Sequence, residues 1–257
     1  MIKVLDHGYV ELIETWGSDE RIIESARMST NKGFQGWGPR HTNACMKSMI
    51  SVNPDTGKFD HECSCDFNSP GDEKLLRYLY EHKHMTPFEM AGMTIEVQAP
   101  IFVFREWHRH RTQSYNEMSA RYTPMPDVNY VPSLERVMQT GGTNKQSIGL
   151  DGKALDDYNA SVWRQELQDL YTRAQEIYNM GLELGVPKEL ARLVLPVGRY
   201  SRMRASANLR NWLAFLTLRM DPAAQWEIRQ YANTLHNQLA VLFPRVMTLF
   251  DEGQKDE

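Results

Sequence analysis

The pattern of apolar and polar positions at the start of the chain predicts two strands followed by a helix. Short alternating apolar runs lie on either side of Gly8 in residues 2–15, which is typical of two strands joined by a turn. Ser18 and Asp19 come next, and both residue types commonly cap the first turn of a helix. We therefore expect a helix over residues 19–29.

The next periodic segments predict a helix, a strand and a second helix in close succession. Leucines and a tyrosine recur at helical spacing in residues 71–84, whereas residues 92–100 alternate as a strand does. The apolar letters IFVF open residues 101–111, which we expect to form a helix that leaves the core.

Helical patterns dominate the C-terminal half. An amphipathic pattern covers residues 157–184 and stops at Gly185, and Pro187 is suited to begin a further helix. Two more helical patterns occupy residues 208–219 and 223–243. Together the patterns predict an α/β fold of the mixed α+β kind with a helix-rich C-terminal half.

Two polar segments rich in glycine interrupt this order, at about residues 31–70 and 140–156. Neither has a stable hydrophobic period, so both are expected to run over the surface. The simplest account is a single domain over residues 1–257 with two surface insertions.

Composition and charge narrow the classes of function. With 257 residues, 41% of them hydrophobic, the chain can bury a sizeable core, and it holds no apolar run of about 18 residues that could cross a membrane. The net charge of −4 argues against binding nucleic acid through bulk charge and favours small anionic ligands. The first residues lack a signal-peptide pattern, so we expect a cytoplasmic protein without membrane or nucleic-acid partners.

The cysteines and histidines do not predict a metal site. Three cysteines are an odd number in a long chain, and His61, Cys63 and Cys65 lack the spacing of common zinc sites. His82 and His84 are two residues apart and would diverge on a helix, so hydrogen bonding is their favoured role.

Positive charge is concentrated in two stretches. Residues 109–122, RHRTQSYNEMSARY, follow the apolar IFVF, and Arg105 and Arg109 would share the face of a helix. Such crowding is favourable only with a polyanionic ligand or with acidic residues from another segment, and a solvated helix end is the alternative. For each arginine of the second stretch a surface salt bridge is the commoner role, although the group together suits phosphates or planar rings. This stretch contains Arg192, Arg199, Arg202, Arg204, Arg210 and Arg219.

The common nucleotide and nucleophile motifs are missing from the sequence. There is no GxGxxG after a strand, no GxxxxGK[ST] and no GxSxG. A dinucleotide or a phosphate would therefore have to be held in another way.

The first basic stretch resembles a known signature. Arg109, His110 and Arg111, followed by seven residues and Ser119, match the RHR-x7-S motif of flavin-dependent thymidylate synthases. The agreement extends along most of the chain, through LDHGYVELIETWGSD, SARMS, HMTPFE, APIFVFREWHRHR, GVPKELARLVLP, NLRNWL and LRMDPAAQWEI. The two polar segments have no counterpart in the compact members of this family.

This resemblance implies a homotetrameric α/β enzyme whose active sites are shared between subunits. The family converts dUMP to dTMP with 5,10-methylenetetrahydrofolate as one-carbon donor and with FAD, reduced by NADPH, as hydride carrier. A flavin route fits the lack of a cysteine in a Pro-Cys-His setting, because hydride addition can activate the pyrimidine without an enzyme nucleophile.

The resemblance also implies roles for individual residues. Arg219 is implied as the catalytic residue that ionises or polarises N3 of uracil, and Ser119 as a hydrogen-bonding group rather than a nucleophile. The implied dUMP contacts are Glu106, Trp107, His108, Arg109, Glu117, Met118, Ser119, Ala120, Arg121, Arg192 and Arg219. The implied FAD contacts are Ser29, His84, Thr86, Arg109, His110, Arg111, Glu117, Asn208, Leu209, Arg210 and Ala214.

Two positions depart from the family pattern. Glu106 stands where the family has glutamine, and a carboxylate near a nucleotide is unfavourable unless a cation neutralises it. Pairing with Arg105 or Arg109 would do so. Ala214 replaces a polar flavin contact, so the adenosine end of FAD could be held differently.

Other functions are kept as alternatives. The nearest is a pyrimidine nucleotide hydroxymethylase on the same fold, with Glu106 and the insertions altering specificity. A non-catalytic nucleotide- or RNA-binding protein would use the arginines together with Trp107 and Trp212. A helical assembly protein would leave Glu117, Ser119 and Arg121 unexplained.

Overall fold

The computed structural model describes residues 1–38, 71–139, 147, 149 and 153–254. Contacts within the chain separate two compact units: the first comprises residues 1–15, 93–207 and 211–238, and the second residues 16–92, 208–210 and 239–257, each within the described ranges. The expected excursion at 31–70 lies outside the described residues from position 39 onward, as does most of the segment 140–152.

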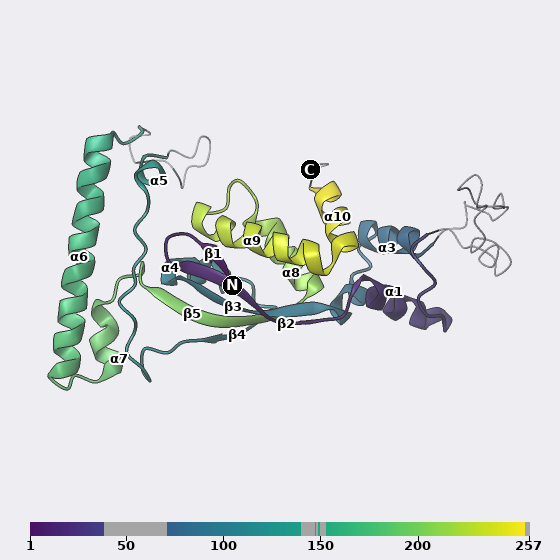
Figure 1. Ribbon diagram of the computed structural model, residues 1–257, viewed down its shortest axis with the longest axis horizontal. Coiled ribbons are helices and arrows are strands. Elements are labelled where there is room, and N and C mark those ends of the chain that lie inside the picture. The colour runs from purple at the N-terminus through teal and green to yellow at the C-terminus, as the bar shows by residue number, and fades with distance from the viewer. Residues whose placement is uncertain (39–70, 140–146, 148, 150–152, 255–257) are drawn as a thin grey trace, which may run out of the picture. The chain divides into compact units, whose positions relative to one another are not determined.

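The first unit is built on a five-stranded sheet in the order β1-β2-β3-β5-β4 (Figure 1). Its strands are β1 (Ile2–Val4), β2 (Gly8–Trp16), β3 (Gly92–Pro100), β4 (Ser114–Glu117) and β5 (Tyr200–Asn208). The antiparallel hairpin of β1 and β2 confirms the strand, turn and strand predicted around Gly8. At the other edge, β4 pairs antiparallel with β5, with Tyr115 opposite Ala205.

Side-chain alternation gives this sheet one buried and one open face. Met93, Ile95 and Val97 of β3 are fully buried, whereas Arg202 and Arg204 of β5 are exposed. Successive residues of a strand point to opposite faces, so the arginines line the face away from the core.

Two helices, α8 (Leu209–Arg219) and α9 (Trp226–Leu242), cover the buried face. Trp212 of α8 donates from Nε1 to the Met93 carbonyl at 3.1 Å, and the Tyr231 hydroxyl of α9 donates to the Gln98 carbonyl at 2.8 Å. A Cβ at Gly8 would lie 2.0 Å from the Tyr231 hydroxyl oxygen. This close approach of strand and helix therefore requires glycine.

A long helix, α6 (Asp157–Glu183), stands at one end of the first unit beside α5 (Leu134–Met138) and α7 (Lys188–Ala191) (Figure 1). The Asp156 side chain caps it by accepting from the N–H of Asn159, and Gly185 ends it with a φ of +83°. Pro187 is the N-cap residue of α7. These boundaries agree with those predicted from the sequence. A 3-10 turn, η4 (Arg192–Val194), follows α7 and contacts α6.

The second unit is helical. It contains α1 (Asp19–Arg27), η1 (Met28–Thr30), α3 (Asp72–Glu81), η2 (Thr86–Met90), α10 (Pro244–Gly253) and the end of α9. Ser18 caps α1 as predicted, accepting from the N–H of Arg21. Asp72 is fully buried, pairs with Arg27 and accepts from the backbone N–H of Gly36, which joins α1 and α3.

The structure confirms the mixed α/β fold class and most of the predicted elements. The helices predicted over 19–29 and 101–111 are shorter, ending at Arg27 and at Trp107. β4, β5 and α10 have no counterpart among the predicted elements. None of the helices in the described ranges is both long enough and apolar enough to span a membrane.

Candidate active site

The RHR signature lies on a turn and not on a helix. α4 (Ile101–Trp107) buries Val103, Phe104 and Trp107 and ends at its C-cap residue His108. The expectation that Arg105 and Arg109 share a helix face is therefore wrong, because Arg109 lies beyond the end of the helix.

Contacts to the core fix this turn, which leads from α4 to β4. Trp107 is fully buried, 4.8 Å from Phe215 between ring centroids, and donates from Nε1 to Oε1 of Gln113 at 3.1 Å. The Tyr115 hydroxyl donates to the carbonyl of His110 at 2.7 Å. The backbone of the RHR signature is therefore held in place by side chains that pack in or beside the core. The indole of Trp107 belongs to the core, and its backbone carbonyl already accepts from the N–H of His110 at 3.0 Å.

Arg219, at the end of α8, is anchored against the turn by three hydrogen bonds. Its Nη1 donates to the Glu106 carboxylate at 2.8 Å, its Nη2 to the Glu106 carbonyl at 2.8 Å, and its Nε to Nε2 of His110 at 2.9 Å. The ion pair of Glu106 is therefore with Arg219, which corrects the pairing with Arg105 or Arg109 expected from the sequence. A guanidinium has five N–H groups, so two remain to bind a ligand.

His110 is neutral in this arrangement. Burial, followed by the charge of Arg219, lowers its pKa from the usual 6.5 to about 4. Because Nε2 accepts from Arg219, the ring proton lies on Nδ1. His110 can therefore offer an uncharged N–H donor at neutral pH.

Arg109 and Arg111 flank His110 and are both exposed. Within the described part of the chain their guanidinium groups have no hydrogen-bond or ion-pair partner. Residues 106–111 and Arg219 together carry three arginines and one carboxylate, that of Glu106. The net positive charge and the free forked donors suit an anionic ligand.

A second group of implied nucleotide contacts gathers around α7. Ser119 begins a turn in which its Oγ accepts from the N–H of Arg121 at 3.3 Å. Arg121 donates from Nε to the Glu189 carboxylate at 3.1 Å, and Arg192 donates from Nε to the Glu189 carbonyl at 3.3 Å. The structure thus brings Ser119, Arg121 and Arg192 together through Glu189. Sequence analysis missed Glu189, although its position three residues before Arg192 at a helix end was an available signal.

Six implied flavin contacts belong to the second unit. Arg210 pairs there with Glu89 of η2, and Leu209 is buried with its N–H bonded to the Ala91 carbonyl. Ser29, His84 and Thr86 are exposed. The six are Ser29, His84, Thr86, Asn208, Leu209 and Arg210.

The remaining implied contacts lie in the first unit. His108, Glu117 and Ala214 are exposed, and Met118 and Ala120 are half-buried. In the described residues no three histidine, cysteine or acidic side chains are placed to hold a metal ion, and His61, Cys63 and Cys65 lie outside them. Nδ1 of His82 lies 2.9 Å from the Tyr78 carbonyl, which confirms a hydrogen-bonding role for that histidine.

The second arginine stretch does not act as one cluster. Arg199 is fully buried and pairs with Asp127, whereas Arg202 and Arg204 lie near Glu96 on the open face of the sheet. Arg202 and Arg204 follow the surface salt-bridge role that was favoured for single arginines, whereas the ion pair of Arg199 differs in that the arginine is buried.

Comparison with known proteins agrees with the residue-level resemblance. The family model described as thymidylate synthase complementing protein matches residues 11–245. The flavin-dependent thymidylate synthase of Thermus thermophilus is 34% identical over 98% of this chain and 78% of its own length. That of Thermosipho africanus is 34% identical over 91% of this chain and 87% of its own length. The crystal structure of a UMP/dUMP methylase, PolB from Streptomyces cacaoi bound with 5-Br dUMP, is 32% identical with a TM-score of 0.73, covering 98% of this chain and 97% of that one. On this evidence the chain belongs to the flavin-dependent thymidylate synthase family.

Proposed function

We propose that the protein methylates C5 of dUMP to give dTMP, using 5,10-methylenetetrahydrofolate, NADPH and FAD. The observation that carries the proposal is the anchored Arg219, which keeps two N–H donors for a ligand beside neutral His110 on the family's signature turn. The family of the chain and the names of its relatives support the same reaction.

The residues on the signature turn fit a flavin. Arg109 and Arg111 are exposed cations without a partner among the described residues, and they can hold the anionic parts of FAD. His110 offers a neutral N–H donor, which binds a carbonyl or a ring nitrogen without adding charge. Reduced FAD supplies the hydride in this chemistry, with NADPH as its reductant. The other proposed flavin contacts are those of the family, Ser29, His84, Thr86, Glu117, Asn208, Leu209, Arg210 and Ala214.

For dUMP, we assign the phosphate to Arg121 and Arg192 and the uracil ring to Arg219. Arg121 and Arg192 converge on Glu189, so an incoming phosphate dianion would find two guanidinium groups already positioned. Arg219 would stabilise the negative charge that develops on the ring when C5 becomes a nucleophile. Because that charge is largest in the transition state, the contact contributes to kcat.

A second candidate substrate is UMP. The structurally similar PolB carries the description of a UMP/dUMP methylase and has also been crystallised with 5-Br UMP. UMP and dUMP differ at one ribose hydroxyl, so the two substrates can be compared directly.

We further propose that the protein acts in the cytoplasm as a homotetramer with active sites shared between subunits. The exposure of Arg109, Arg111 and Arg192 in the single chain supports a site that is completed by another subunit.

The test is anaerobic turnover of the purified protein with FAD, NADPH, methylenetetrahydrofolate and either dUMP or UMP, with the product identified by mass. We expect dTMP, and we expect it to disappear in Arg219→Ala while that variant still binds FAD. A hydroxymethylated product would move the function to the hydroxymethylase alternative. Flavin oxidation without any nucleotide product would refute the proposal.

A further inference from the structure

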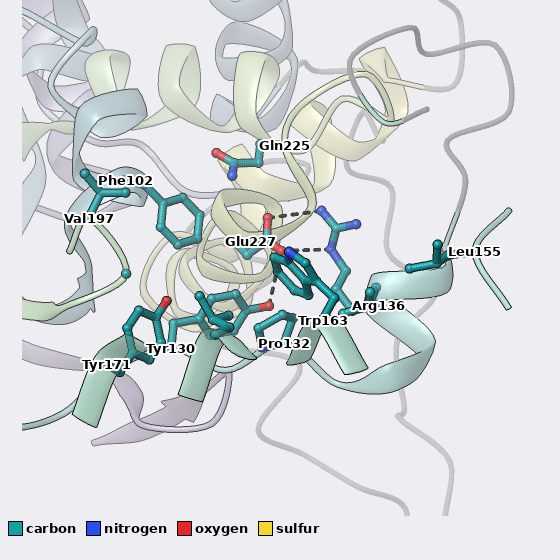
Figure 2. Close-up of a pocket in the computed structure, with 13 residues that line it drawn as sticks. Phe102, Tyr130, Pro132, Arg136, Leu155, Trp163, Tyr171, Val197, Gln225 and Glu227 are labelled. Carbon is teal, nitrogen blue, oxygen red and sulfur yellow. Dashed lines mark hydrogen bonds and ion pairs between the residues drawn. The ribbon is translucent and has the colours of Figure 1, made fainter. Parts of the chain in front are cut away.

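A separate cavity of about 550 Å³ lies in the first unit between α4, α5, α6 and the start of α9 (Figure 2). Its volume falls in the range of roughly 300 to 1,000 Å³ that small-molecule sites usually have. None of the residues implied in dUMP or FAD binding lines it. The family reaction as proposed therefore gives this cavity no role.

Aromatic side chains form most of the cavity wall. Phe102 comes from α4, Tyr130 from the loop before α5, and Trp163 and Tyr171 from α6 (Figure 2). Trp163 is 49% exposed in the described structure, although a tryptophan is normally among the most buried residues. Flat rings on several sides favour a flat aromatic ligand, because such a ligand can stack on one ring and meet others by their edges.

A buried carboxylate also lines this cavity. Glu227 is only 3% exposed and is held by Arg136, whose Nε and Nη2 donate to its two carboxylate oxygens at 2.8 and 3.3 Å. The Tyr130 hydroxyl donates to the same carboxylate at 3.2 Å, and burial raises the pKa of this phenol, so the hydroxyl stays protonated. The carboxylate is therefore satisfied and does not require a cationic ligand.

Arg136 still has donors to offer. Two of its five N–H groups are used by Glu227, so three remain, and the amide of Gln225 also lines the cavity. A second carboxylate here would leave the site with a net negative charge in a partly buried position, which is unfavourable. A neutral carbonyl accepts the same hydrogen bond without that cost.

We propose that this cavity binds an uncharged, planar, bicyclic aromatic molecule with a carbonyl group, stacked among Phe102, Tyr130 and Trp163 with its carbonyl accepting from Arg136. The inference is independent of the proposed dUMP chemistry, since it concerns other residues and is tested by binding alone.

The probe is 2-quinolinone, a neutral bicyclic lactam, titrated by ligand-observed NMR into protein saturated with FAD and dUMP so that those sites are blocked. A ligand of this size is expected to bind with a Kd of about 0.1 to 1 mM. The anionic analogue 2-naphthoate is expected to bind at least about fivefold more weakly, because of the charge argument above.

Leu167 lines the cavity and Leu170 does not, although both lie on α6 and Leu170 is exposed. Leu167→Trp should fill the space and weaken quinolinone binding at least about tenfold, whereas Leu170→Trp should leave it unchanged. If Leu167→Trp fails to fold, Trp163→Ala serves with Val162→Ala as its control. No saturable binding to the wild-type protein, or equal loss in both members of a pair, would overturn the proposal.

Discussion

At the scale of single residues, the contact between Arg219 and His110 is the most informative feature of the site. Burial, and after it the positive charge of Arg219, lowers the pKa of His110 to about 4, so the imidazole is neutral throughout the physiological range. Since the unfolded chain has a histidine of ordinary pKa, it binds more protons than the folded chain between about pH 4 and 6.5. His110 therefore makes the protein less stable as the pH falls through this window.

We predict that Arg219→Ala raises the pKa of His110 towards its ordinary value, because the neighbouring positive charge is lost and water gains access. Arg219→Lys keeps a cation at this position and should leave the pKa low. The measurement is an NMR titration of the histidine ring protons from pH 4 to 8, with His110→Gln to assign the signal. An unchanged titration in Arg219→Ala would show that Arg219 does not influence the imidazole.

Glu106 is one of the two positions at which the resemblance implies a departure from the family pattern. Its carboxylate, 43% exposed, cancels part of the charge of Arg219 while fixing the position of the guanidinium. Glu106→Gln keeps an oxygen that can accept from Nη1 and removes the negative charge. We predict that dUMP binds about 3- to 10-fold more tightly to this variant, as expected when a partly screened like charge is removed.

Glu106→Ala is the control for this prediction, because it removes the charge and the hydrogen bond together. It should lower kcat, since Arg219 is then free to leave its position. The Kd of dUMP is measured by calorimetry for both variants. Weaker binding in Glu106→Gln would contradict the electrostatic argument and assign Glu106 a direct contact with the nucleotide.

The ion-pair partner of Glu106 could not be predicted from the sequence. Glu106 and Arg219 are 113 positions apart, and local spacing pointed to Arg105 and Arg109. The end of α4 at Trp107 moves Arg109 off the helix, so the local pairing is lost. The role proposed for Arg219 rests on the resemblance to a family, since no local pattern in the sequence points to it.

At the scale of elements, periodicity predicted the long helices and β3 well, and it missed β5. Residues 200–208 do alternate, but the buried positions include the small residues Ala205 and Ala207 and the exposed ones are arginines. A weak apolar signal combined with strong charge suggested a ligand cluster in place of a strand. β4 has four residues and no apolar period, so its position depends on pairing with β5.

The Tyr115 hydroxyl holds the turn between α4 and β4. Removal of this hydroxyl should make the backbone of the RHR signature less well fixed. We predict that Tyr115→Phe lowers the free energy of unfolding by about 1 kcal/mol, the usual value for one hydrogen bond, and weakens FAD binding several-fold. Tyr158→Phe on α6, an exposed tyrosine, is the matched control. Urea denaturation and flavin titration measure the two effects. FAD affinity equal to that of the wild type would mean that the hydroxyl does not position the turn.

In the second unit, Asp19 joins the first turn of α1 to the N-terminus of α10 by accepting from the N–H of Arg245 at 2.9 Å. Burial raises its pKa from 3.8 to about 6. The folded state then binds more protons than the unfolded state between these values, so the contribution of Asp19 to stability falls as the pH rises from about 4 to 6.

We predict that Asp19→Asn removes this part of the pH dependence and makes the protein more stable at pH 7 by roughly 1 to 2 kcal/mol. Asp157→Asn, at the equivalent first position of α6, is the control. Urea denaturation at several pH values measures the difference. A variant with the same slope between pH 4 and 6 as the wild type would contradict the assignment.

At the scale of the whole molecule, the net charge of −4 conceals a strongly local distribution. The described structure places cations in two separate groups of the first unit, one around His110 and Arg219 and the other around Glu189. Composition alone favoured a small anionic ligand, but it could not show that the predicted nucleotide contacts divide into two groups. That division gives the proposed sharing of active sites a direct test.

If one active site takes Arg219 from one subunit and Arg192 from another, two inactive variants should complement each other. We predict that a co-expressed equal mixture of Arg219→Ala and Arg192→Ala chains regains up to about one quarter of the wild-type turnover, because random assembly leaves that fraction of sites with both arginines. Arg219→Ala mixed with His110→Ala should regain nothing, since these two residues are bonded within one chain. Different affinity tags on the two chains, with purification over both tags in succession, establish that mixed oligomers have formed. Mixed oligomers without recovered turnover would place both arginines of a site in a single subunit, and the exposure of Arg192 would then need a different explanation.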